Sequence, residues 1–248
     1  MCVVTELKLA DIDDLHQIRT EIQFKSTRKG AFLVKEKCLF QLVIKENIMF
    51  KAKNIDETWK LENGRKTKVL FGKNKPYPPK TSIKRIYALF YYLMNKYPQI
   101  NIEMLCDSAS IQEKMDEDIC AVYCYDNNDT GKIIINSDKW GEMAHFNMFG
   151  KGGIPDGVLM EKWNLEDVHH KNHLQYVFIH EFAHAVETQM GLYKNKEIID
   201  IYNKYKKQYG FDEDISEFIV HCFVTSMVAK NNKTANEVKR IIEKAIGE

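Results

Sequence analysis

The chain has 248 residues, of which 44% are hydrophobic and 29% are charged, with 13 Phe and 12 Tyr. This composition is typical of a globular protein with a sizeable core, and it excludes a disordered or fibrous chain. The 36 Lys and Arg residues almost balance the 35 Asp and Glu residues, which leaves a net charge of +1. No overall field therefore draws the molecule to nucleic acid or to an acidic membrane, and such a partner would need a local patch.

Membrane and secretion signals are not recognisable in the sequence. No stretch approaches the roughly 18 consecutive apolar residues of a membrane-spanning helix, and segment 1–14 has neither a basic start nor a small-residue cleavage site. Among the six scattered cysteines, only Cys120 and Cys124 lie close together, at a spacing that puts both on one face of a strand. Disulfide frameworks and metal knuckles need tighter, repeated spacing. We expect reduced, structural thiols and a cytoplasmic protein without a membrane partner, with non-classical export left open.

Residues 1–79 form an N-terminal region in this interpretation. The apolar stretches of residues 33–50 suit one or two strands, although a helix also fits. Segment 51–85 has eleven Lys and Arg residues against three acids, and it includes prolines at 76, 78 and 79. Because clustered prolines continue neither a helix nor a central strand, this segment is expected to be a linker or an extended arm. The region before residue 80 is then a targeting or regulatory segment.

Residues 80–248 have the pattern of an α+β domain. A Thr-Ser start and a stop at Pro98 predict a helix over 81–97. Strands are predicted at 100–105, 119–125 and 132–136, the last two joined as a hairpin. A loop rich in Gly and Met follows, over about 137–165. Helices are then predicted at about 172–190, 195–209, 213–229 and 235–246, the last capped by Thr234.

The helix at 172–190 carries the motif H-E-x-x-H, formed by His180, Glu181 and His184. Histidines four residues apart project from one helical face, so both imidazoles can reach one tetrahedral zinc ion at about 2.0–2.1 Å. A zinc-bound water has a pKa near 7, and the adjacent Glu181 would accept its proton to give the nucleophile for peptide-bond attack. The apolar surroundings favour this reading over a buried pair of core histidines, because unpartnered polar side chains are costly to bury.

Zinc held by two histidines needs a third protein ligand, and Glu217 is the candidate. It lies 33 residues after His184, on a helix that also carries His221 one turn later. The residues directly after His184 lack the Gly and His of the short-loop type of site, so the ligand must come from a later helix. The alternative is that Glu217 is a surface carboxylate on an amphipathic helix.

The motif H-E-F-A-H followed by S-E-F in a later helix resembles the gluzincin branch of the zincin metallopeptidases. Within that branch, the stretches HEFAHAVE and YGFDEDISEFIVHCF are similar to the lethal-factor-like domains, which include the proline-specific endopeptidases of bacteria. The resemblance covers about residues 80–248. It implies a zincin-like fold: a small mixed sheet with an edge strand over the active-site helix, followed by a helical C-terminal subdomain.

The resemblance also implies further site residues. A tyrosine of the family supports the tetrahedral intermediate, and Tyr209 matches it with an offset of about one residue. The family binds an extended substrate along an edge strand, for which 132–136 is the candidate. The following loop, with Trp140, His145, Phe149 and glycines at 150, 152 and 153, is equally interpretable as a lid or as a surface loop.

One position departs from the family pattern. Many gluzincins have an acidic residue one turn after the glutamate ligand, where it supports a zinc histidine; this chain has His221. We expect His221 to hydrogen-bond near the metal, to act as an alternative ligand, or to replace Tyr209 as the oxyanion donor. Three further histidines, His169, His170 and His173, are interpreted as solvated residues at a helix start, in preference to a second metal site.

Two functions are therefore weighed. The leading hypothesis is an endopeptidase with one zinc ion per chain, bound by His180, His184 and Glu217, that hydrolyses an extended peptide or protein with Glu181 as general base and acid. The alternative is a non-catalytic zincin-like scaffold that binds nucleic acid or an acidic protein through segment 51–85, in which Trp59 and Tyr77 are interleaved with the lysines.

Overall fold

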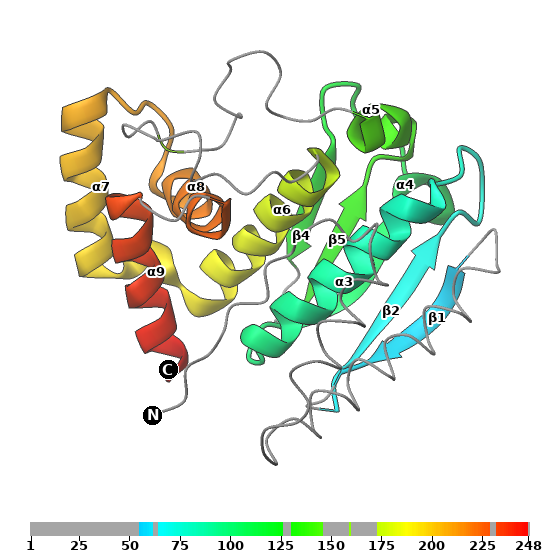
Figure 1. The fold of residues 1–248 in the computed structure, drawn as a ribbon, viewed down its shortest axis with the longest axis horizontal. Helices are drawn as coiled ribbons and strands as arrows, with labels where there is room; N and C mark the ends of the chain where they lie inside the picture. The colour runs from blue at the N-terminus through cyan, green and yellow to red at the C-terminus, as the bar shows by residue number, and fades with distance from the viewer. Residues whose placement is uncertain are drawn as a thin grey trace, which may run out of the picture. The chain divides into compact units, whose positions relative to one another are not determined.

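A five-stranded mixed sheet lies at the centre of the fold (Figure 1). The computed structural model describes residues 55–61, 64–125, 130–145, 159, 173–228 and 232–247, all within the unit Lys53–Glu248. The strands are β1 Ile55–Lys60, β2 Lys66–Phe71, β3 Ile102–Asp107, β4 Ala121–Tyr125 and β5 Gly131–Ile135. Their order across the sheet is β1-β2-β3-β5-β4. The central strands β2, β3 and β5 are parallel, and β1 and β4 run antiparallel to their neighbours.

Helices account for most of the remaining described residues. They are α3 Lys80–Lys96, α4 Ser108–Ile111, α5 Trp140–His145, α6 His173–Met190, α7 Lys196–Tyr209, α8 Ile215–Val228 and α9 Lys233–Ile246, with short 3-10 turns η2 Ser137–Lys139 and η4 Leu192–Lys194. The α+β class predicted from the sequence is confirmed, as is the antiparallel pairing of the hairpin strands β4 and β5. None of the described helices has the length and apolar character needed to cross a membrane.

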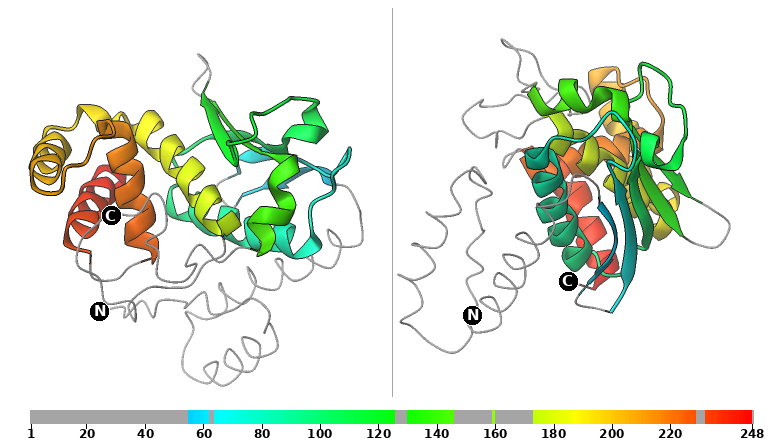
Figure 2. Two further views of the ribbon diagram at one scale, coloured as in Figure 1. Left: turned by 90° about the horizontal axis from the view of Figure 1, so that it is seen from above. Right: turned by 90° about the vertical axis from the view of Figure 1, so that its right-hand side faces the viewer.

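The main core lies between the sheet and the helices α3 and α6, which cover one face of it (Figures 1 and 2). Phe90 of α3 is central to this core because its ring contacts both Trp59 of β1, at 5.6 Å between centroids, and Phe178 of α6, at 6.2 Å. Trp59 also packs edge-on against Tyr87 at 4.5 Å. These aromatic contacts fix α6 against the sheet and thereby fix the position of the H-E-x-x-H motif.

The basic segment 51–85 contains the strands β1 and β2, so the expectation of a linker or arm was wrong for these residues. In β2, Thr67, Val69 and Phe71 are buried and alternate with the more exposed positions. The many lysines made this alternation difficult to recognise in the sequence. In the strand, the alternation places Val69 and Phe71 on the core face and Lys66 and Lys68 on the other face. The boundary expected after Pro79 falls between β2 and α3, inside the unit Lys53–Glu248. Residues 33–50 lie outside the described residues.

The two edge strands of the described sheet are β1 and β4, so the expectation that 132–136 would form an edge was wrong. β5 lies between β3 and β4, paired on both sides. Its burial agrees with this position, because Ile133, Ile134 and Ile135 are all buried. A strand covered on both faces and flanked by neighbours has a continuous apolar run, whereas β4 becomes more exposed toward Tyr125.

The expected loop at 137–165 begins with ordered structure. The turn η2 and helix α5 occupy 137–145, and Trp140 is buried with its ring 6.0 Å from that of Phe71. Trp140 is therefore a core residue and not part of a lid. Phe149 and residues 150–153 lie outside the described residues, and His145 is the last residue of α5.

The helices α7, α8 and α9 follow α6 and gather at one end of the sheet (Figure 1). α8 packs against both α6 and α9. Gly210 ends α7 in the left-handed conformation, with φ of 70°, and so allows the chain to turn into α8. α9 is capped by Asn232, whose side chain accepts from Ala235 N at 2.8 Å. The expected cap Thr234 lies inside the helix, because the Asn carbonyl reaches the free backbone N–H groups first.

Candidate metal centre

Helix α6 supplies His180, Glu181 and His184. Most of its other side chains in this stretch are apolar and buried, including Phe178, Phe182 and Val186. The two histidines lie on the side that faces α8 and stay partly accessible, with exposed side-chain fractions of 29% and 21%. Their rings stand at 76° to each other with centroids 4.8 Å apart, so the two imidazoles converge as the spacing predicts.

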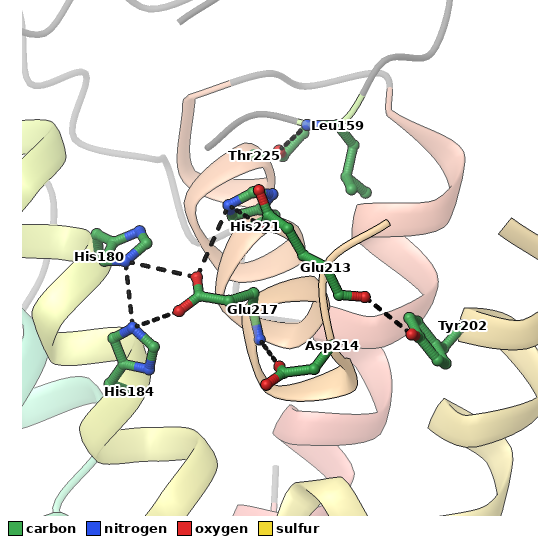
Figure 3. Close-up of polar contacts among 9 residues, drawn as sticks. All are labelled: Leu159, His180, His184, Tyr202, Glu213, Asp214, Glu217, His221 and Thr225. Atoms are coloured by element: carbon green, nitrogen blue, oxygen red, sulfur yellow. Dashed lines mark hydrogen bonds and ion pairs between the residues drawn. The ribbon is translucent and has the colours of Figure 1, made fainter. Parts of the chain in front are cut away.

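Helix α8 supplies Glu217 in its first turn. Asp214 precedes the helix and accepts a hydrogen bond from Glu217 N at 3.0 Å, which holds the start of α8 in place. The carboxylate of Glu217 extends across to α6, between the paired histidines and His221 (Figure 3). Its side chain is 35% exposed, and its carboxylate lies beside the imidazoles of His180 and His184.

Donor atoms of three residues, called here the donor triangle, converge at the centre of this arrangement. Nε2 of His180 lies 3.1 Å from Nε2 of His184. The two oxygens of Glu217 each face a different histidine, with Oε1 3.4 Å from His184 Nε2 and Oε2 3.7 Å from His180 Nε2. Ligands placed about 2.0–2.1 Å from a tetrahedral zinc ion lie about 3.3–3.4 Å from one another. The two imidazoles and the carboxylate are therefore arranged around a space of the size that a metal ion needs.

The protonation states of these groups agree with metal binding. Burial lowers the pKa of His180 to about 4, helped by the nearby His184, so this imidazole is neutral at pH 7. The hydrogen bond with His184 lowers the pKa of Glu217 and keeps its carboxylate ionised. Burial is the largest single influence and acts to lower the pKa of His184, but the hydrogen bond to Glu217 and the nearby carboxylates of Glu181, Glu217 and Glu187 together give a net upward shift. A proton on His184 must therefore leave when a metal ion binds.

Glu181 is 7% exposed, and its side chain is directed to the sheet. Its carboxylate accepts a hydrogen bond from the backbone of Tyr123 in the edge strand β4. Burial raises the pKa of Glu181 to about 7, although His184 and the Tyr123 backbone favour the ionised form. A carboxyl group with this pKa can both accept and return a proton near neutral pH.

His221 forms a second group with residues of the same site. Its Nε2 lies 3.4 Å from Glu213 Oε2 and 3.9 Å from Glu217 Oε2. The donor atoms of His180, Glu217 and His221 all lie within 4.8 Å of one another, which is compatible with a metal ion. This set shares two members with the His180, His184 and Glu217 triangle.

Tyr209 is placed differently from the other predicted site residues. It is 42% exposed at the end of α7, stacks on Tyr205 at 4.6 Å and accepts a hydrogen bond from Gln208. Among the described residues, no contact joins Tyr209 to the histidine and glutamate cluster. His169 and His170 lie outside the described residues, and His173 is the first residue of α6.

Two contributors were missed by sequence reasoning. Glu213 stands only four residues before Glu217, in an acidic stretch that reads as a solvated turn. Tyr123 contributes through its backbone, which has no sequence signature. The acidic spacing E-x-x-x-E-x-x-x-H at 213–221 was the available signal for Glu213, since it places three ligand-type residues one helical turn apart.

Comparisons of the chain with protein-family models, with curated proteins and with solved structures found no match. The fold and the geometry of the site therefore carry the functional argument by themselves.

Proposed function

We propose that this protein is a zinc-dependent endopeptidase with a zincin-like fold of the gluzincin type, and that it binds one zinc ion through His180, His184 and Glu217. The observation that carries the proposal is the convergence of two imidazoles and a carboxylate from two separate helices: the imidazole Nε2 atoms lie 3.1 Å apart, and the two Glu217 oxygens lie 3.4 Å and 3.7 Å from them. An adjacent buried carboxyl group, Glu181, provides the general base that hydrolysis requires.

The roles follow from the position of each side chain. A bound zinc ion would polarise the scissile carbonyl and lower the pKa of a coordinated water. Glu181 would accept a proton during attack and return it to the leaving amine, for which a pKa of about 7 is suited. Of the two candidates for oxyanion stabilisation, His221 is supported by its place 3.9 Å from Glu217, whereas Tyr209 belongs to the exposed end of α7.

The substrate would be a peptide or protein segment in extended form. β4 ends the strand order of the described sheet, and its Tyr123 backbone contacts the general base. An extended peptide that added to this edge would lie beside Glu181 and the donor triangle, with main-chain hydrogen bonds providing affinity.

The alternative of a nucleic-acid or acidic-protein binder has less support. Trp59, one of its two aromatic residues, is 2% exposed and packs in the core, and Lys68 forms an ion pair with Asp56. Tyr77, the other aromatic residue, is 49% exposed, but no contact of the described residues points to a bound nucleic acid or acidic protein.

The proposal is tested with the full chain after removal and restoration of zinc, using a mixed peptide library analysed by mass spectrometry. Cleavage that depends on zinc, and that is lost in Glu181→Gln while zinc is retained, supports it. The matched control is Glu197→Gln, which neutralises an exposed glutamate of α7. One zinc ion bound without cleavage of any library member, or equal cleavage by Glu181→Gln, overturns the catalytic assignment.

A further inference from the structure

Two facing helices each present a pair of ligand-type side chains spaced by four residues. α6 carries His180 and His184, and α8 carries Glu217 and His221. Residues at this spacing lie on the same face of a helix, one turn apart. Because α6 and α8 pack against each other, the two pairs face one another (Figure 3), and the donor atoms of His180, Glu217 and His221 all lie within 4.8 Å of one another. The chain therefore has four candidate protein ligands where a catalytic zinc site uses three.

The oxygen Oε2 of Glu217 lies between the two histidines that could use it. It is 3.7 Å from His180 Nε2 and 3.9 Å from His221 Nε2. The second distance exceeds the roughly 3.3–3.4 Å between ligands of a tetrahedral zinc ion by only about half an ångström. The donor atoms of His180, Glu217 and His221 lie within 4.8 Å of one another, so a movement of the His221 ring toward His180 would bring its Nε2 to an ion bound by His180 and Glu217.

His221 is held away from that position by Glu213. Its Nε2, the same atom that would bind metal, lies 3.4 Å from Glu213 Oε2. The His221 side chain is 10% exposed, whereas that of Glu213 is 47% exposed. Phe211 packs edge-on against the His221 ring at 5.6 Å. A buried ring beside an exposed carboxylate can exchange one partner of Nε2 for another without leaving its place in the core.

We propose that His221 is a fourth protein ligand of the zinc ion, and that it exchanges between the ion and Glu213. Four protein ligands close a tetrahedral site, while a hydrolytic site needs one open position. Binding of His221 would therefore produce a latent state, and its return to Glu213 would open the position needed for hydrolysis. This regulation rests on the proposed zinc peptidase function.

The test is X-ray absorption at the zinc edge on the full-length zinc-loaded protein, which counts the imidazole ligands. In Glu213→Gln the competing carboxylate is lost, so we expect three imidazoles. In His221→Gln we expect two imidazole ligands. In the wild type we expect an average between two and three. Zinc transfer to a chelator should also be at least about ten-fold slower from Glu213→Gln than from His221→Gln. Ten-fold is the lower end of the change in metal affinity expected when a group that supports a metal ligand is lost.

Two imidazoles in both Glu213→Gln and the wild type overturn the inference. Because Glu213 is exposed, its variant should fold, so the comparison remains decisive even if His221→Gln does not fold. His180→Ala, which removes a ligand common to both possible sets, separates this failure from that of the proposed function. A wild type that binds no zinc refutes both proposals. If the wild type binds one zinc ion, His180→Ala binds none and Glu213→Gln has two imidazoles, the exchange alone is refuted.

Discussion

Oε1 of Glu217 lies 3.4 Å from Nε2 of His184, although 33 positions separate the two residues in the sequence. Helix α7 and the turn at Gly210 occupy most of that interval and bring α8 onto α6. The contact converts a two-histidine motif into a set of three converging donors. It also lowers the pKa of Glu217 and raises that of His184, so the two side chains stabilise each other's charged form before a metal ion binds.

Removal of one zinc ligand should abolish tight metal binding. We expect His184→Ala to weaken zinc affinity by more than about 100-fold, since even groups that only support a ligand contribute about 10–100-fold. Elemental analysis of protein purified without a histidine tag should give one zinc ion per wild-type chain and none in the variant. Far-ultraviolet circular dichroism should show that the variant remains folded. Equal zinc content in both proteins would mean that His184 is not required and would favour the set formed by His180, Glu217 and His221.

Loss of the general base should affect turnover and leave metal binding intact. We expect Glu181→Gln to retain one zinc ion and to lose about 10²–10⁴ in kcat, the range typical of general acid–base catalysis. Steady-state kinetics on a peptide found in the library screen would measure this loss. A parallel loss of zinc would instead assign Glu181 a structural role in the centre.

The stability of the metal-free protein should depend on Glu181 and on pH. Burial in the folded state raises the pKa of Glu181 from 4.5 to about 7, so the folded state disfavours the ionised carboxylate. The resulting loss of stability begins as pH rises past 4.5 and is complete above about 7, where it amounts to about 3 kcal/mol. Glu181→Gln should then be more stable than wild type at pH 8 and similar at pH 4.5.

Urea unfolding in the presence of a chelator at both pH values measures this difference. The exposed control Glu197→Gln should show no such change between the two pH values. A stability difference for Glu181→Gln that is the same at pH 4.5 and pH 8 would contradict the assignment of a raised pKa.

Zinc binding should release a proton in the neutral range. The pKa of His184 is raised above 6.5 by Glu217, so the imidazole is largely protonated at pH 6, while zinc binds only the neutral form. We expect release of about one proton at pH 6, declining as pH rises through the pKa of His184. Calorimetric titrations in buffers of different ionisation enthalpy measure this number. Zinc affinity and proton release that do not vary between pH 6 and pH 8.5 would refute the expectation.

The pairing of the edge strand β4 with β5 should be sensitive to a single methyl group added at Gly131, the first residue of β5. A Cβ atom there would lie 2.5 Å from the Tyr123 ring, whose hydroxyl also accepts from Gln189 of α6 at 2.9 Å. We expect Gly131→Ala to destabilise the protein by about 1–3 kcal/mol through overpacking. Gly141→Ala is the matched control, because its Cβ would meet nothing within 4 Å. Thermal unfolding compares the two, and equal melting temperatures would contradict this account.

Local patterns in the sequence were sufficient to predict several features of the site. The apolar spacing around His180 and His184 predicted the helix that carries them, and α6 begins and ends within one residue of the predicted 172–190. Helical periodicity and capping act over a few residues, so the sequence alone determines them. The candidate ligand Glu217 could be found because only ligand-type residues on a later helix could complete the motif.

Other features depended on contacts between distant segments. The alternation of lysines with Thr67, Val69 and Phe71 became recognisable as a strand only once β2 was paired with β3. In the same way, the hairpin pattern predicted both β4 and β5 but contained no information about which of them pairs with β3. Pairing order depends on the packing of the whole sheet, which no short segment specifies.

The electrostatic character of the centre was also decided by tertiary structure. The sequence determined that Glu181 follows a zinc-type histidine, but its raised pKa comes from burial beneath β4. His221 was identified from the sequence as a departure from the family pattern, whereas its pairing with Glu213 required the turn before α8 to fold over the ring. Residue type and spacing are local properties, while burial and the partner of each donor atom arise only when distant segments pack together.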